Sequence, residues 1–282
     1  MSIETWLDER ERSGTTFFSR EEIQRAFPQK AYNVLGSELS RLCARRVLAN
    51  VLNGFYVKIP VRYAADGIVP PEYYIDQLMR HLGRPYYISL TSAAQLFGAG
   101  HQAPQRCCVF TTRPVMCTSE RKNPSVFWGY RREIPQQLLI QRNSETAAVN
   151  YSSPELTAVD LVQYSQYIGG LSRASTVLAE LLDSTDFANA NPHLYQFASL
   201  AAFQRLGYIA EEILENQEQA DALHKRLCDV DLHFRWAALS KQKPADETMP
   251  RSSRWKVIVN TNIEVDDLVR ETLIERIPGR RL

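Results

Sequence analysis

Residues 17–58 read FFSREEIQRAFPQKAYNVLGSELSRLCARRVLANVLNGFYVK, and this stretch decides the fold of the N-terminal part of the chain. Two short helical patterns are followed by a polar turn between two apolar segments. The patterns predict a first helix after Phe18, a second helix over residues 30–46, and strands at 47–51 and 55–59. This order of elements is typical of a winged helix-turn-helix, which binds DNA.

The first helix carries its start signals in the sequence. Ser19 followed three residues later by Glu22 fits a capping box, and Phe18 with Ile23 fits a hydrophobic staple. Pro28 ends the helix, because proline disfavours the helical region for the residue before it. The sequence therefore predicts one short helix that begins at Ser19.

The second helix has an apolar face and a polar face. Leucines and an alanine recur at helical spacing on the first, while Lys30, Asn33, Ser37, Arg41 and Arg45 fall on the other. A recognition helix puts its N-terminal residues into the major groove, so Lys30, Asn33 and Ser37 are the candidates for base contact. We expect Arg41, Arg45 and Arg46 to contact the phosphate backbone.

Asn53-Gly54 between the two strands is a hairpin signal, and the hairpin would carry Asn53 and Lys58 towards a phosphate. The predicted DNA-binding residues are therefore Lys30, Asn33, Ser37, Arg41, Arg45, Arg46, Asn53 and Lys58. An alternative is a helical module with a solvated basic face and no DNA ligand, since amphipathic helices with basic outer faces are common.

Composition places the chain among ordinary soluble proteins. Of 282 residues, 44% are hydrophobic and 23% charged, and the net charge is +1. Local basic patches rather than total charge would have to bind DNA. No secretion signal or membrane span is visible, and the five cysteines form no C-x-x-C pair, so we expect a cytoplasmic protein without a zinc site.

We predict an α+β fold: a winged helix-turn-helix at 1–60, a linker at 61–71, and a mixed α/β C-terminal domain with several helices at 72–282. The expected elements of that domain are a helix from Pro70, strands at 86–90, 106–111, 125–131 and 146–150, a short helix capped by Thr91 or Ser92, helices at 153–162, 172–182, 192–206 and 207–227, and a strand at 254–260.

Charge is unevenly distributed in the C-terminal domain. Residues 101–145 hold seven Lys or Arg against three acids, whereas residues 180–232 hold ten acids against three Lys or Arg. The basic stretch is suited to extend a DNA-binding surface. The acidic stretch is suited to a basic protein partner, although a solvated face is the simpler interpretation.

Several segments resemble the AbiEi family of antitoxins. YYISLTSAAQLFGAGHQAPQRCCVFTT (86–112) is similar to a family signature, and SSPELTAVDLV (152–162), FQRLGYIAEEIL (203–214) and RWKVIVNT (254–261) follow in the family's order. The resemblance implies the antitoxin of a bacterial type IV toxin–antitoxin pair that also represses its own operon. Its partners would be the inverted repeats of operator DNA and a nucleotidyltransferase-like toxin, AbiEii, and the cofactors none.

The sequence shows no catalytic constellation, so we expect no enzyme. Glu120-Arg121-Lys122 has the spacing of a nuclease E-x-K triplet but lies in a predicted turn. His101 in a Gly- and Pro-flanked loop is interpreted as structural, and Asp160 as a buried carboxylate paired with Arg106 or Arg254. Two other functions stay open: a ligand-responsive repressor without a toxin, and a DNA-targeted nuclease that uses Glu120.

Overall fold

The computed structural model of the protein describes residues 2–100, 105–112, 125–230 and 233–266. The interpretations of His101 and of Glu120-Arg121-Lys122 concern residues outside these ranges. By its internal contacts the chain divides into two compact units. Unit 1 comprises Met1–Tyr87, Gln105–Ile134 and Gln141–Asn150, and unit 2 comprises Ile88–Pro104, Pro135–Ile140 and Tyr151–Leu282. The domain boundaries predicted at residues 60 and 72 stay predictions.

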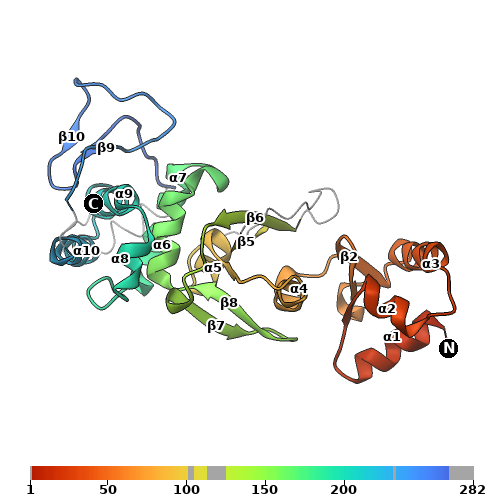
Figure 1. Ribbon diagram of the computed structural model, residues 1–282. Coiled ribbons are helices and arrows are strands. Elements are labelled where there is room, and N and C mark those ends of the chain that lie inside the picture. Colours follow the sequence, from red (N-terminus) through yellow and green to blue (C-terminus); the bar gives the residue numbers. More distant parts are fainter. Residues whose placement is uncertain (1, 101–104, 113–124, 231–232, 267–282) are drawn as a thin grey trace, which may run out of the picture. The chain divides into compact units, whose positions relative to one another are not determined.

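The N-terminal module, residues 2–59, has the element order that the sequence predicts (Figure 1). Its elements are α1 (Ile3–Arg12), β1 (Phe17–Ser19), α2 (Arg20–Ala26), α3 (Tyr32–Ala44), β2 (Leu48–Leu52) and β3 (Phe55–Lys58). The three strands form an antiparallel sheet in the order β1-β3-β2. This arrangement is compatible with a winged helix-turn-helix.

Local signals explain the boundaries of α2. The Ser19 side chain accepts a hydrogen bond from the Glu22 backbone N–H at 3.2 Å, and the Glu22 carboxylate accepts one from the Ser19 N–H at 2.7 Å. The predicted capping box is therefore confirmed. Phe27, directly before Pro28, takes a non-helical conformation and closes the helix.

One apolar core holds the module together. It joins α1, α2, α3 and the sheet through Ile3, Leu7, Phe18, Ile23, Phe27, Leu35, Leu39, Leu42, Leu48 and Tyr56. The Phe18 ring stacks on the Tyr56 ring with centroids 5.4 Å apart, and the Trp6 ring meets Phe18 edge-on at 5.2 Å. The leucines of α3 are spaced as predicted, so its opposite face is left to solvent.

Two details of the module differ from the prediction. The helix α3 begins at Tyr32 rather than at residue 30, because Ala31 is extended and the Lys30 N–H closes a turn onto the Phe27 carbonyl. At the hairpin only Gly54 has a positive φ, of +81°, so Asn53 does not share that conformation.

A five-stranded sheet has the order β6-β5-β4-β8-β7. Its strands are β4 (Tyr86–Ile88), β5 (Cys107–Thr112), β6 (Val126–Arg131), β7 (Leu139–Asn143) and β8 (Ala148–Ser152). The pairs β5–β6 and β4–β8 are parallel. The strand β7 was not predicted, because it lies at the edge of the sheet and its last three residues are exposed, so that it lacks an apolar pattern.

The remaining helices include α6, which is buried over most of its length. They are α4 (Ile75–His81), α5 (Leu90–Leu96), α6 (Pro154–Gln163), α7 (Leu171–Leu181), α8 (His193–Phe197), α9 (Leu200–Tyr208), the π-helix η6 (Ile209–Ile213) and α10 (Gln217–Asp229). The Ser153 side chain caps α6, and every residue from Leu156 to Val162 is buried. Within unit 2, α6 packs against α5, α7 and α9 (Figure 1).

Short elements complete the chain. They are the 3-10 helices η1 (Val61–Tyr63), η2 (Pro71–Tyr73), η3 (Gln136–Leu138), η4 (Ser165–Tyr167) and η5 (Leu182–Ser184), and the strands β9 (Ala237–Ala238), β10 (Arg251–Ser252) and β11 (Val257–Ile258).

The helix α5 starts at Leu90, so neither Thr91 nor Ser92 caps it. The helices predicted at 192–206 and 207–227 are broken into four segments, and the strand predicted at 254–260 is a turn followed by β11. The α+β class is confirmed.

Candidate nucleic-acid interface

The exposed face of α3 is the candidate interface. Leu35, Leu39 and Leu42 are buried, whereas Asn33 and Arg41 are exposed on the other side of the helix. Ser37 lies between them and donates a hydrogen bond from its hydroxyl to the Asn33 carbonyl at 3.1 Å. The structure therefore brings three of the predicted residues together on one solvent-facing stripe, with side chains suited to base edges and phosphates.

Lys30 and Lys58 are placed in ion pairs within the module. Lys30 Nζ lies 2.6 Å from the Glu38 carboxylate. Lys58 Nζ lies 2.7 Å from Asp8 and 2.6 Å from Glu11, with 15% of its side chain exposed. Burial alone would lower the pKa of Lys58, but hydrogen bonds to Asp8 and Glu11 raise it. Phosphate contact by either lysine would have to replace these carboxylates.

The other predicted contacts lie at the edges of the module. Arg45 follows α3 and pairs with Glu4 at 2.7 Å, with both side chains largely exposed. Such exposed pairs are weak, so Arg45 can exchange Glu4 for a phosphate. Arg46 has a positive φ of 57° and donates to the Ala65 carbonyl. Asn53 is exposed at the hairpin turn, between β2 and β3.

Arg20 was missed by the sequence reasoning and links the elements around α3. Its guanidinium donates to the Tyr32 carbonyl at 2.7 Å and lies 4.3 Å from the centroid of the Tyr32 ring. Its backbone N–H donates to the Gly54 carbonyl at 2.7 Å, at the hairpin turn. Arg20 thus joins the start of α2, the start of α3 and the hairpin. The only signal for it in the sequence is an arginine directly after the Ser19 cap.

A surface hollow adjoins the start of α3. Its volume is about 590 Å³, and it is lined by Arg20, Glu21, Gln24, Arg25, Pro28 and Tyr32. The Tyr32 side chain is 63% exposed. Because both charged and aromatic groups line the hollow, it can accept part of a polyanionic ligand that contacts α3.

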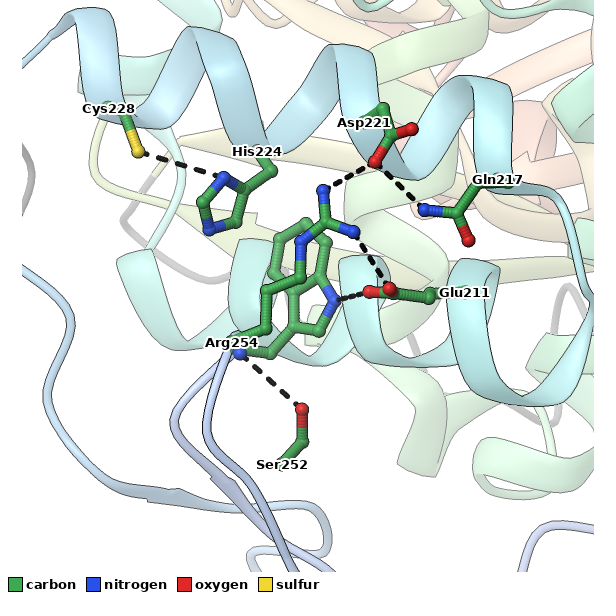
Figure 2. Close-up of polar contacts among 8 residues, drawn as sticks. Glu211, Gln217, Asp221, His224, Cys228, Ser252 and Arg254 are labelled. Carbon is green, nitrogen blue, oxygen red and sulfur yellow. Dashed lines mark hydrogen bonds and ion pairs between the residues drawn. The ribbon is translucent and has the colours of Figure 1, made fainter.

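A second polar cluster lies in unit 2 (Figure 2). Arg254 donates to Glu211 at 2.7 Å and to Asp221 at 2.5 Å, and the Trp255 indole N–H donates to Glu211. In Figure 2 the Arg254 side chain reaches between Asp221 on α10 and Glu211 on the neighbouring π-helix. Gln204 adds hydrogen bonds to the Trp255 carbonyl at 2.7 Å and the Arg235 carbonyl at 2.8 Å. These hydrogen bonds hold the segment around Arg254 and Trp255 against α9, η6 and α10.

Hydrogen bonds and burial set the pKa values in this cluster. The hydrogen bond from Arg254 is the main cause that lowers the pKa of Asp221, and burial lowers the pKa of His224. The His224 Nδ1 lies 3.7 Å from the Cys228 sulfur, one helical turn along α10. Asp221, His224 and Cys228 thus each have a partner within the protein, as expected for side chains that stabilise the fold.

Asp160 is fully buried on α6 and accepts a hydrogen bond from the Ser89 hydroxyl at 2.8 Å. Of the two arginines considered as its partner, Arg254 instead pairs with Glu211 and Asp221. A buried carboxylate needs such hydrogen bonds to offset its lost hydration. Asp160 therefore helps hold α5 and α6 together.

Within the residues that the structure describes, no group of three or more His, Cys, Asp or Glu side chains is arranged to hold a metal ion. Among the helices described, none is long and apolar enough to cross a membrane.

Comparisons with known proteins agree with the resemblance. Residues 87–212 match the family model described as AbiEi antitoxin C-terminal domain. No curated protein matches the chain significantly. The crystal structure of the RV2827C protein from Mycobacterium tuberculosis has a similar fold, with a TM-score of 0.63 and 14% identity over 95% of this chain and 94% of that chain. Residues 87–212 of the chain are therefore similar to the C-terminal domain of AbiEi antitoxins.

Proposed function

We propose that this protein is an antitoxin that binds the operator DNA of its own operon through α3 and the hairpin, and represses that operon in the bacterial cytoplasm. The observation that carries the proposal is the solvent-facing stripe of Asn33, Ser37 and Arg41 on a helix whose other face is buried. A helix presented in this way has the geometry of a recognition helix.

Local charge supports DNA as the ligand. Residues 20–46 hold six Lys or Arg against three acids. Glu22 is occupied in the capping box and Glu38 is paired with Lys30, so two of these acids are already engaged within the module. The surface around α3 is consequently positive, although the whole chain carries a net charge of only +1.

The proposal also assigns the toxin-countering role. The family domain at 87–212 supports an antitoxin whose partner is a nucleotidyltransferase-like toxin encoded beside it. Because the candidate interface lies in residues 2–59, the two roles use different parts of the chain. DNA binding and toxin rescue are therefore expected to be separable by substitution.

A full-length triple variant, Asn33→Ala/Ser37→Ala/Arg41→Ala, tests both roles. We expect it to lose binding to the DNA upstream of its own gene in a gel-shift titration, and to keep rescuing growth when it is co-expressed with the toxin. The charge-matched control is Lys225→Ala, which removes an exposed cation on α10. Upstream DNA bound equally well by the triple variant would refute the assignment to α3.

A further inference from the structure

The polar stripe of α3 contains one apolar side chain. Val34 is 49% exposed, although it lies on the helix face of Ser37, three residues on, and Arg41, seven residues on. The core on the other side of α3 is already filled by Leu35, Leu39 and Leu42. Val34 is therefore not used in packing α3 onto the module.

We infer that Val34 reads a thymine methyl group in the major groove of the operator. This inference rests on the proposed function. Apolar side chains discriminate thymine by contact with its C5-methyl group. Val34 is the third residue of α3, at the end of the helix that enters the groove in a recognition helix.

The neighbouring side chain, Asn33, is also suited to contact an A·T base pair. Asn33 is exposed beside Val34, and asparagine binds adenine through its N6 and N7 atoms. Adenine and thymine present these atoms and the methyl group on the same groove edge. Asn33 and Val34 together therefore favour an A·T-containing half-site.

Conformational rigidity supports contact by Val34. Its branched side chain has one strongly preferred rotamer in a helix, so its methyl groups keep a fixed direction. The start of α3 is also fixed, because the Arg20 guanidinium donates to the Tyr32 carbonyl at 2.7 Å. Val34 therefore loses little conformational freedom when it contacts a base.

Deoxyuridine substitution tests the inference, because it removes the thymine methyl group and leaves the hydrogen-bonding pattern unchanged. The full-length protein is titrated on footprinted upstream DNA in which each thymine of a half-site is replaced in turn. We expect one position at which Kd rises about fourfold, the ratio that corresponds to about 0.8 kcal/mol for one buried methyl group. Val34→Ala should bind the thymine and deoxyuridine duplexes equally at that position.

Arg41→Ala is the matched control on the same face. It should weaken binding to both duplexes by the same factor and keep the fourfold ratio, since a phosphate contact carries no base information. If the wild-type protein binds the upstream DNA but no deoxyuridine changes its Kd, the inference is overturned while the proposed function stands. The inference also fails if Val34→Ala retains the ratio. Absence of any binding to the upstream DNA refutes both.

Discussion

A single methyl group added at Gly207 in α9 is expected to destabilise the folded protein strongly. A Cβ atom built there would meet Cη2, Cζ3 and Cε3 of the Trp255 ring far inside van der Waals contact. Trp255 is fully buried, and its indole N–H and backbone carbonyl are held by Glu211 and Gln204. The ring therefore has no free direction in which to move, and Gly207→Ala must displace either the segment that carries Trp255 or α9 itself.

The magnitude follows from these contacts. Overpacking a tight core costs about 1–3 kcal/mol. The helix propensity of alanine offsets about 1 kcal/mol of this, because glycine is the poorer helix former. Since Trp255 is fixed by two further residues, we expect a net loss of about 2 kcal/mol in the free energy of unfolding, which lowers Tm by roughly 4–8 °C for a chain of this size. Thermal unfolding followed by circular dichroism measures the shift.

Gly36 provides the matched control, because among the residues that the structure describes it is the other glycine within an α-helix. A Cβ there would meet only the flexible end of Arg20, with Nη2 at 3.1 Å. Gly36→Ala should therefore keep or raise Tm, through the same propensity gain of about 1 kcal/mol. Equal Tm values for Gly207→Ala and the wild type would show that Trp255 does not pack on α9 in this way.

Two further predictions concern charge. Arg41→Ala should reduce the slope of log K for DNA binding against log salt concentration by about 0.9, the value for one phosphate contact. Lys30→Ala should leave the slope unchanged, because Glu38 already neutralises Lys30. Equal slopes for the wild type and Arg41→Ala would show that Arg41 does not contact the phosphate backbone. The pKa of Asp221 is lowered from its ordinary value of 3.8, chiefly by Arg254, so its contribution to stability is present above pH 3.8 and is lost as pH falls through the folded-state pKa. Tm measured between pH 2 and 6 should consequently fall less steeply on acidification in Asp221→Asn than in the wild type, and parallel curves would contradict the ion pair.

Local sequence signals predicted the N-terminal module well. The Ser19–Glu22 capping box and the two hairpin strands depend on residues close together in the chain, and the structure confirms them. The start of α3 was misplaced by two residues, because Lys30 is polar at a helical position but closes the turn after Phe27 instead. Propensity alone does not distinguish these two uses of a lysine.

Contacts between distant residues explain most of the errors elsewhere. The segment 254–260 has the composition of a strand, yet Arg254 and Trp255 form a turn because Glu211, Asp221 and Gln204 bind them from helices more than 30 residues away. The break between η6 and α10 does have a local signal in the sequence, which is Asn216. Its side chain accepts a hydrogen bond from the Gln219 N–H and caps α10. An asparagine in a run of helix formers was too weak a signal to divide the predicted helix.

The ion pairs of the module limit how DNA affinity can arise. From sequence, Lys30 is a candidate base contact and Lys58 a candidate phosphate contact, but Lys30 is paired with Glu38 and Lys58 is bonded to two carboxylates that lie 47 and 50 residues away in the chain. Among the described residues 20–46, the arginines without a carboxylate partner are Arg20, Arg25, Arg41 and Arg46, and Arg45 has only an exposed ion pair. Arg20 and Arg46 donate to the Tyr32 and Ala65 carbonyls, which leaves Arg25, Arg41 and Arg45 as the most available for phosphates. Two or three phosphate contacts per copy give a salt slope of about −2 to −3. Under the proposed function, tight binding to the operator would come from base contacts along Asn33, Val34 and Ser37, or from two copies on an inverted repeat, for which the slope would double.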